Sequence, residues 1–272
     1  MPTKQALPRR QALSGAAALS ATGRSAAAQA PATVDPWPSL AAQIFDNQQL
    51  ADGSSTLGID LPYRAEDAAL VPVNIRNLLP AGDSRQIQTI TLVIDQNPSP
   101  LAATFSLGAN SGITTLSTRV RVDSYTNVHA VAATSGGQLY AAQRFVKAAG
   151  GCSAPAAKQE AGSIPLGTMR FRQFPLTSGS GTREIQLMIR HPNFSGMQMD
   201  QLTRLYVPAH FVSSVRIWQG DELLLGIDSG ISISENPEFR FDYRPNGAAE
   251  FRAEVQDSQG HSFKHTWSAV PA

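Results

Sequence analysis

The sequence predicts an all-β protein with two immunoglobulin-like β-sandwich domains, one short N-terminal helix and a flexible segment between the domains that carries the single cysteine. Two observations predict this class. From Leu70 onward, apolar and polar residues alternate in short runs that recur about every 8–12 residues, which is the spacing of strands in a β-sandwich. Gly (21 residues) and Pro (18 residues) are frequent between these runs, as in chains with many tight turns.

The first 30 residues have the layout of an export signal. A short basic segment ends in Arg9 and Arg10, a weakly apolar stretch rich in Ala and Leu follows, and Ala28-Gln29-Ala30 supplies the small residues that a signal peptidase requires. The paired arginines favour the twin-arginine route. Cleavage after Ala30 would deliver the mature protein to the periplasm. A disordered Ala-rich tail is the alternative interpretation.

The mature chain divides into a first domain at residues 31–147 and a second at residues 166–272. A helix is expected from Trp37 to Leu50, where Leu40, Ile44 and Phe45 have helical spacing. The strands expected in the first domain are residues 70–76, 87–94, 102–107, 114–122, 128–133 and 139–146. Those expected in the second are residues 169–174, 184–190, 211–218, 222–227, 238–243, 248–255 and 262–267.

Residues 148–165 are predicted to be a mobile linker. The run from Ala148 to Ser163 has no periodicity and no large apolar side chain, so it cannot bury enough surface to offset the entropy of ordering it. The linker carries Cys152 directly after Gly150 and Gly151, which we expect to give the arm its flexibility.

An unpaired cysteine in an exported protein calls for an explanation, because exported cysteines are normally paired in disulfides. We expect Cys152 to be an exposed thiol with an ordinary pKa of about 8.5, so that replacing it by serine leaves the melting temperature unchanged. Two alternatives are a buried cysteine that acts as a small apolar residue and a linker thiol without a role.

Composition and motifs argue against several functions. The net charge of +1 indicates neither nucleic acid nor an anionic membrane as a partner, and no apolar run is long enough to span a bilayer. His261 and His265 share one face of a strand and could hold a metal, but two surface histidines are the preferred interpretation. No histidine is fixed beside the thiol by the sequence, so we expect no catalytic residue, no metal site and no cofactor.

Two groups of short motifs occur, one in each half of the chain. Those of the first half are Val71-Pro72-Val73, Ile94 to Pro100, Ser117 to Arg121 and Gly150-Gly151-Cys152. Those of the second half are His191-Pro192 with Gly196, Val207 to Val212, Gly230-Ile231-Ser232, Asn236-Pro237 and Asp257 to Gly260. By these motifs, residues from about Leu70 to Cys152 resemble SoxY and residues from about Arg183 onward resemble SoxZ, the two subunits of the Sox thiosulfate-oxidation carrier.

The resemblance implies a periplasmic carrier without catalysis of its own, in which Cys152 holds a covalent sulfur adduct while sulfur-oxidising enzymes act on it. Here Ser153-Ala154-Pro155 follows the cysteine and the chain continues, whereas the arm of SoxY is a chain end. Fused chains of this kind also resemble carriers associated with quinoprotein dehydrogenases, so a dehydrogenase with a cytochrome is the other class of partner. The alternative function is a non-covalent adaptor that docks to such a dehydrogenase or cytochrome.

Overall fold

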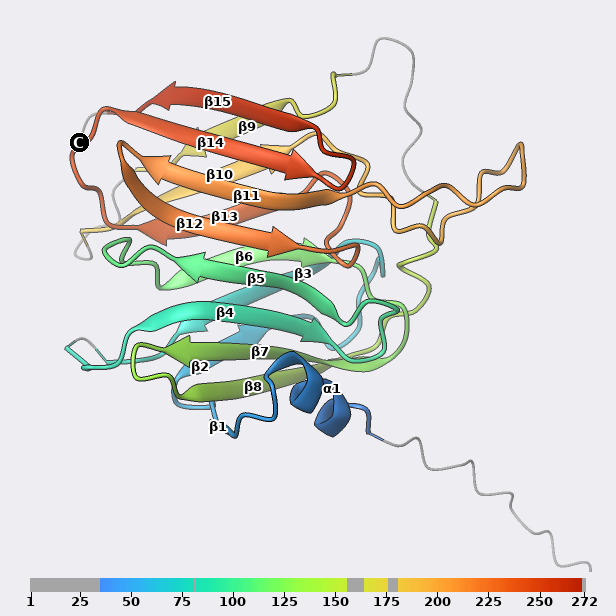
Figure 1. Cartoon of the computed structure of the whole chain (residues 1–272), viewed down its shortest axis with the longest axis horizontal. Helices are drawn as coiled ribbons and strands as arrows, with labels where there is room; N and C mark the ends of the chain where they lie inside the picture. The colour runs from blue at the N-terminus through green and yellow to red at the C-terminus, as the bar shows by residue number, and fades with distance from the viewer. Residues whose placement is uncertain (1–34, 81, 156–163, 176–180, 271–272) are drawn as a thin grey trace, which may run out of the picture. The chain divides into compact units, whose positions relative to one another are not determined.

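The computed structural model describes residues 35–80, 82–155, 164–175 and 181–270, and its elements lie in a unit that begins at Pro36 (Figure 1). The export signal expected at residues 1–30 lies outside the described residues, as do residues 156–163 of the expected linker. No helix among the described residues is long and apolar enough to cross a membrane.

The described chain contains one helix and fifteen strands. The elements of the first domain are α1 (Trp37–Ile44), β1 (Leu50–Asp52), β2 (Leu57–Asp60), β3 (Val71–Asn77), β4 (Ile87–Ile94), β5 (Leu101–Leu107), β6 (Thr115–Val120), β7 (Thr126–Thr134) and β8 (Leu139–Val146). Those of the second are β9 (Met169–Gln173), β10 (Arg183–Ile189), β11 (Val212–Gln219), β12 (Glu222–Ser229), β13 (Glu238–Tyr243), β14 (Glu250–Asp257) and β15 (Ser262–Ser268).

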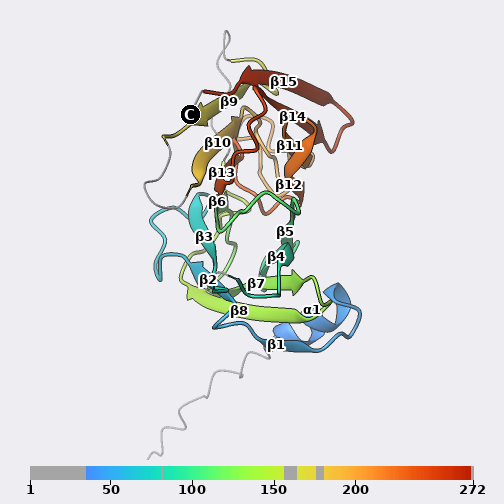
Figure 2. The ribbon, with the colours of Figure 1, turned by 90° about the vertical axis from the view of Figure 1, so that its left-hand side faces the viewer.

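These strands form two sheets that face each other across an apolar core (Figure 2). One sheet has nine strands in the order β1-β8-β7-β4-β5-β12-β11-β14-β15, and the other has six in the order β2-β3-β6-β13-β10-β9. Each sheet therefore contains strands of both domains. The prediction of an all-β fold with two β-sheet domains and one short helix is confirmed.

The joint between the domains differs from the expected flexible connection. Strand β12 pairs antiparallel with β5, with Leu225 opposite Leu107 and Ile227 opposite Phe105, and β13 pairs with β6 through Phe241 and Leu116. A strand at the edge of a sheet carries unpaired N–H and C=O groups, and pairing it with another strand satisfies them. The two domains are thus held together by backbone hydrogen bonds in both sheets.

Alternation of apolar and polar residues determines which side of each strand enters the core. In β3, Val71, Val73 and Ile75 are buried while the residues between them are exposed. Pro72 lies where β3 has β6 on one side only, because β2 pairs with β3 from Asn74 onward. A proline can occupy that position without removing a hydrogen bond of the sheet on its unpaired side.

The expected helix is shorter than its pattern suggested. It ends at Ile44, and the apolar Leu50 belongs to β1, which pairs in parallel with β8. The strands β1 and β2 were not predicted, because runs of 3 and 4 residues are too short for a periodicity of two to be recognised.

Candidate carrier site

Cys152 is buried, with no exposed surface, in a turn that follows β8. The expectation that it is an exposed thiol on a mobile arm is therefore wrong for this structure, in which residues 148–155 are ordered around it. The alternative of a buried cysteine matches the observed position. The physical reason lies in the backbone of the segment, which binds its surroundings although its side chains are small.

Two backbone hydrogen bonds join the cysteine turn to the residues that follow β6. The N–H of Gly150 donates to the carbonyl of Asp123 at 2.8 Å, and the N–H of Gly151 donates to the carbonyl of Val122 at 2.9 Å. Each bond of this kind contributes about 1 kcal/mol net. The turn is thereby attached to the first domain immediately before Cys152.

The two glycines have different roles in this arrangement. Gly150 has φ +78°, a conformation that side chains with a Cβ rarely adopt, and open space surrounds it. Gly151 lies against another segment of backbone, so that a Cβ there would be 2.0 Å from the carbonyl oxygen of Ala68 and 2.7 Å from that of Val122. Gly150 therefore permits the turn, and Gly151 permits close packing. The docked turn therefore requires these glycines for conformation and packing, whereas the sequence suggested that both serve flexibility.

The second domain holds the same turn from the other side. Ser195, in the loop between β10 and β11, donates its hydroxyl to the carbonyl oxygen of Cys152. Arg121 donates from Nη1 to the carbonyl of Gly151 at 3.3 Å and from Nη2 to the carbonyl of Asn193 at 3.2 Å. The cysteine turn thus contacts both domains at once.

Residues of both domains also fix the backbone of Arg121. Asn97 donates from Nδ2 to the carbonyl of Arg121 at 2.8 Å and to Oγ of Ser232 at 2.9 Å. The N–H of Arg121 donates to the carbonyl of Ser232 at 2.8 Å. Ser232 comes from the segment between β12 and β13, so these contacts cross the joint between the domains.

The environment of the thiol keeps it protonated. Burial and, to a smaller extent, the negative charge of Asp123 raise the pKa of Cys152 to about 12, while the positive charge of Arg121 acts in the opposite direction. The thiolate is the nucleophilic form of a cysteine, so the docked Cys152 is chemically inert at neutral pH. The ordinary pKa expected from the sequence does not apply to the docked state.

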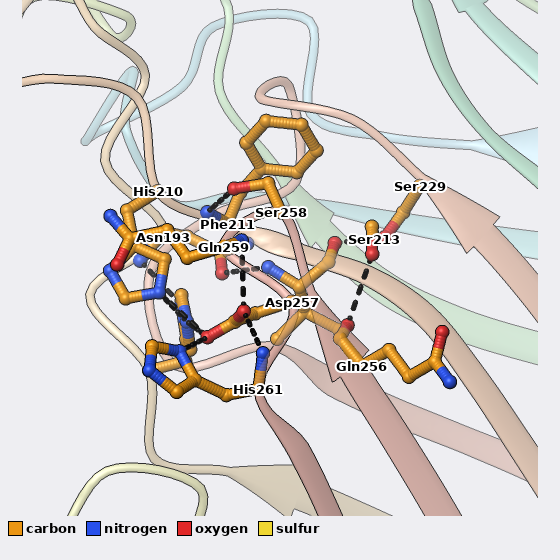
Figure 3. A network of polar contacts seen from close by, with 12 residues as sticks. Asn193, His210, Phe211, Ser213, Ser229, Gln256, Asp257, Ser258, Gln259 and His261 are labelled. Carbon is orange, nitrogen blue, oxygen red and sulfur yellow. Dashed lines mark hydrogen bonds and ion pairs between the residues drawn. The ribbon is translucent and has the colours of Figure 1, made fainter.

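Three histidines and one aspartate form a cluster in the second domain, and Figure 3 shows three of them, His210, Asp257 and His261. Oδ2 of Asp257 lies 2.7 Å from Nε2 of His210, 2.8 Å from Nδ1 of His261 and 3.6 Å from Nε2 of His191. Burial opposes ionisation of Asp257, but the hydrogen bonds from His210 and His261 outweigh it and hold the pKa of this carboxyl well below its usual range. Burial and, to a smaller extent, the nearby ring of His210 lower the pKa of His191 to about 4.

His191, His210 and Asp257 could hold a metal ion, because one ligand atom from each lies within 4.8 Å of the others. The hydrogen bonds of these residues indicate a protonation state that does not suit a metal ion. Nδ1 of His191 accepts the N–H of Asn193 at 3.1 Å, so the hydrogen of the neutral ring is on Nε2, the nitrogen that a metal would need. The cluster therefore acts here as a hydrogen-bonded network around Asp257. It orients the Asn193 loop that contacts Arg121.

The pattern of the sequence predicted a different pair of histidines, His261 and His265, on one face of a strand. In the structure, His261 precedes β15 and contacts Asp257. The ring of His265 lies 4.6 Å from that of Trp267. Sequence spacing could not reveal the actual cluster, because its members come from three separate segments. A signal was nevertheless present, since the SoxZ-like motifs contain His191, His210 and Asp257.

Comparison with protein families accounts for both halves of the chain. Residues 41–152 match the family described as "Sulfur oxidation protein SoxY", and residues 175–268 match the family described as "Sulphur oxidation protein SoxZ". The chain is a SoxY domain fused to a SoxZ domain. The SoxY match ends at Cys152 itself, so the docked thiol is the last residue of that domain. No curated protein matched the chain.

The similar solved structures include a sulfur carrier protein and a superoxide reductase. The sulfur carrier protein SoxY from Chlorobium limicola f thiosulfatophilum is 26% identical, with a TM-score of 0.33, and the match covers 41% of this chain and 94% of that one. A superoxide reductase (neelaredoxin) from Ignicoccus hospitalis is 13% identical, with a TM-score of 0.30, and the match covers 34% of this chain and 79% of that one.

Proposed function

We propose that this SoxY–SoxZ fusion is a covalent carrier that holds a sulfur intermediate on Cys152 and has no catalysis of its own. The observation that carries the proposal is the position of Cys152 at the end of the SoxY match, in a turn that contacts both domains. The chain contains no other cysteine. The sequence of residues 1–30 supports export to the periplasm, where sulfur-oxidising enzymes, or a quinoprotein dehydrogenase with its cytochrome, would act on the adduct.

Such a carrier alternates between two states. In the docked state, Cys152 is buried and protonated, which protects it from adventitious oxidation. Loading and unloading require the turn to leave its contacts with Val122, Asp123 and Ser195, because a partner enzyme cannot reach a thiol without exposed surface. Once undocked, the thiol regains the pKa of an ordinary cysteine, about 8.5.

Loading with sulfane sulfur tests the proposal. The Cys152 thiolate attacks a polysulfide chain Sₙ²⁻ and takes one sulfur atom, which leaves a Cys152 persulfide and a polysulfide shortened by one atom. We expect mass spectrometry to show whole-sulfur additions to the wild-type protein, removable by dithiothreitol, and none to Cys152→Ser. A sulfur-oxidising enzyme of the same operon should consume this adduct faster than glutathione persulfide at equal concentration.

The non-covalent adaptor remains the second candidate, and the burial and raised pKa of Cys152 favour it. The two proposals differ in what they require of the thiol. An adaptor would bind its dehydrogenase or cytochrome equally well as wild type and as Cys152→Ser. If the wild-type protein stays unmodified by polysulfide, or if glutathione persulfide serves the enzyme equally well, the carrier proposal fails and the adaptor takes its place.

A further inference from the structure

A cavity remote from Cys152 lies at the joint between the two domains. Its volume is about 610 Å³, which is in the range of sites that bind small molecules. The β3–β4 connection and the β5–β6 loop of the first domain form most of its wall, and Arg244, which follows β13, brings the second domain to its rim. Both connections lie at the left-hand end of the strands in Figure 1.

Strand β6 separates this cavity from the cysteine turn. The cavity wall includes Thr114, which lies directly before β6, whereas Val122 and Asp123, which bind the cysteine turn, follow the end of this strand. The 6 residues of β6 span roughly 20 Å as extended chain. A ligand in the cavity therefore leaves the cysteine turn free for a partner.

The second domain holds the β5–β6 loop, residues 108–114, in place. Gly108 donates its N–H to the carbonyl of Leu224 at 2.9 Å, and it lies so close to β12 that a Cβ would be 1.8 Å from a carbonyl oxygen of that strand. The carbonyl of Ser111 accepts the N–H of Arg244 at 2.7 Å. The wall of the cavity is therefore preformed by backbone contacts, and a ligand needs to order little of the loop in order to bind.

The cavity combines an apolar floor with a polar rim. Four aliphatic side chains line the floor and belong to the core or pack against it: Leu79, Ile87, Leu107 and Ile113. None of the described residues that line the cavity is an aspartate or a glutamate. An apolar floor with a few polar groups is typical of sites for small organic molecules, and the absence of carboxylates from this lining disfavours a cation.

The two arginines among the described lining residues differ in what neutralises them. Arg85 donates to both carboxylate oxygens of Asp83, from Nε at 3.0 Å and from Nη2 at 2.8 Å. Within the described part of the chain, the guanidinium of Arg244 has neither a hydrogen bond nor an ion pair. Asp242, two positions earlier, instead accepts the hydroxyl of Thr114 and its N–H, the latter at 2.8 Å.

Gly112 leaves room for the unpaired arginine. It has φ +64°, and a Cβ at this position would be 3.0 Å from Cβ of Arg244 and 3.6 Å from its Cζ. The side chain of Arg244 therefore lies against the β5–β6 loop, at the rim of the cavity. An anion bound there replaces water around an exposed guanidinium, while the apolar part of the same molecule enters the floor.

We propose that this cavity binds a small organic carboxylate, whose apolar body occupies the floor and whose carboxylate pairs with Arg244. A guanidinium matches a carboxylate because two of its N–H groups donate in parallel to the two oxygens. The proposal is independent of the carrier function. Binding in the cavity and sulfur loading of Cys152 use different residues, so each can be present without the other.

Titration of the full chain with octanoate, octanol and octylammonium, followed by two-dimensional ¹H–¹⁵N NMR, tests the proposal. The three probes have chains of equal length and differ in charge. We expect octanoate to cause saturable shifts of the backbone signals of residues 108–114. Octanol should bind at the same residues about fivefold more weakly, because it lacks the exposed charge pair, and octylammonium should bind more weakly than octanol.

Three variants separate charge from shape. Arg244→Gln should bind octanoate about fivefold more weakly than wild type and octanol equally well. Arg76→Gln is the matched control, since Arg76 is another exposed arginine of the six-stranded sheet but pairs with Asp60 at 2.6 Å, and both affinities should stay unchanged. Gln88→Trp places a large side chain in the lining and should weaken octanoate and octanol alike.

The proposal is overturned if octanoate causes no saturable shifts at residues 108–114, or if folded Arg244→Gln binds octanoate as tightly as wild type. Should Arg244→Gln fail to fold, the comparison of octanoate with octanol on the wild-type protein decides, and equal affinities would overturn the proposal. Each of these outcomes is distinguishable from failure of the carrier function, because the polysulfide assay at Cys152 is carried out without any carboxylate probe.

Discussion

The contact between Gly151 and the backbone of Ala68 makes a sharp prediction about the docked turn. Alanine at position 151 would place its Cβ 2.0 Å from the carbonyl oxygen of Ala68, a distance that cannot be relieved by moving a side chain. The turn must therefore leave its site or displace the backbone of both segments. Gly151→Ala should shift the equilibrium from the docked to the undocked state.

The size of the shift follows from the hydrogen bonds of residues 151 and 152, the ones that the added Cβ disturbs directly. These are the bond from Gly151 to Val122, the bond from Arg121 to Gly151 and the bond from Ser195 to Cys152. At about 1 kcal/mol net for each bond, the docked state loses about 3 kcal/mol, which corresponds to roughly a hundredfold increase in the undocked population.

The rate of alkylation of the native protein by iodoacetamide at pH 8 measures this population, since only the undocked thiol reacts. We expect Gly151→Ala to react about a hundredfold faster than wild type, up to the rate of an unfolded chain. Gly150→Ala keeps open space around its Cβ and should be about tenfold faster, from backbone strain alone. Gly137→Ala has the same strain, at φ +77°, in the β7–β8 turn and should leave the rate unchanged.

Circular dichroism and the melting temperature must show that each variant is folded, because global unfolding would also expose the thiol. If folded Gly151→Ala reacts as slowly as wild type, the turn does not dock against Ala68, and burial of Cys152 does not depend on this contact.

Three other predictions follow from the site. Cys152→Ser should lower the free energy of unfolding in urea by about 1–3 kcal/mol, because a hydroxyl replaces a buried thiol. An unchanged free energy of unfolding would show that the side chain is exposed, as the sequence suggested. Ser195→Ala should speed alkylation about fivefold to tenfold by freeing the carbonyl of Cys152, whereas Ser213→Ala should not, because the hydroxyl of Ser213 donates to the carbonyl of Gln256. Because the pKa of His191 is about 4 when folded and about 6.5 when unfolded, the unfolded chain takes up a proton first as the pH falls. Stability should therefore decrease by up to about 3 kcal/mol between pH 6.5 and 4, and His191→Asn should flatten this profile; an unchanged slope would refute the assignment.

Local pattern was sufficient to predict most of the strands. The bounds of β4 and β8 agree with the sequence prediction, because each is a run of eight residues bounded by turn residues. Local pattern says nothing of which strands pair over long separations. The β5–β12 ladder joins residues more than a hundred positions apart, so the continuity of the sheets across the domains was not predictable in this way.

The burial of Cys152 was not predictable from the size of the side chains around it. Small side chains do not imply a lack of burial, because a segment also buries its backbone. Gly151 has no side chain to bury, and for that reason it approaches Ala68 more closely than any other residue could. The same glycines that suggested a mobile arm are required for the docked turn.

In the fused chain, exposure of Cys152 requires the loss of contacts with both domains. Val122 and Asp123 of the SoxY domain hold the turn by its N–H groups, and Ser195 of the SoxZ domain holds it by the carbonyl of Cys152. Neither domain alone supplies both sets of contacts, and the chain continues from Ser153 toward β9, so the thiol is tethered on both sides. A partner that exposes Cys152 must therefore replace contacts from the two domains together. This arrangement gives the SoxZ domain a part in controlling access to a thiol that belongs to the SoxY domain.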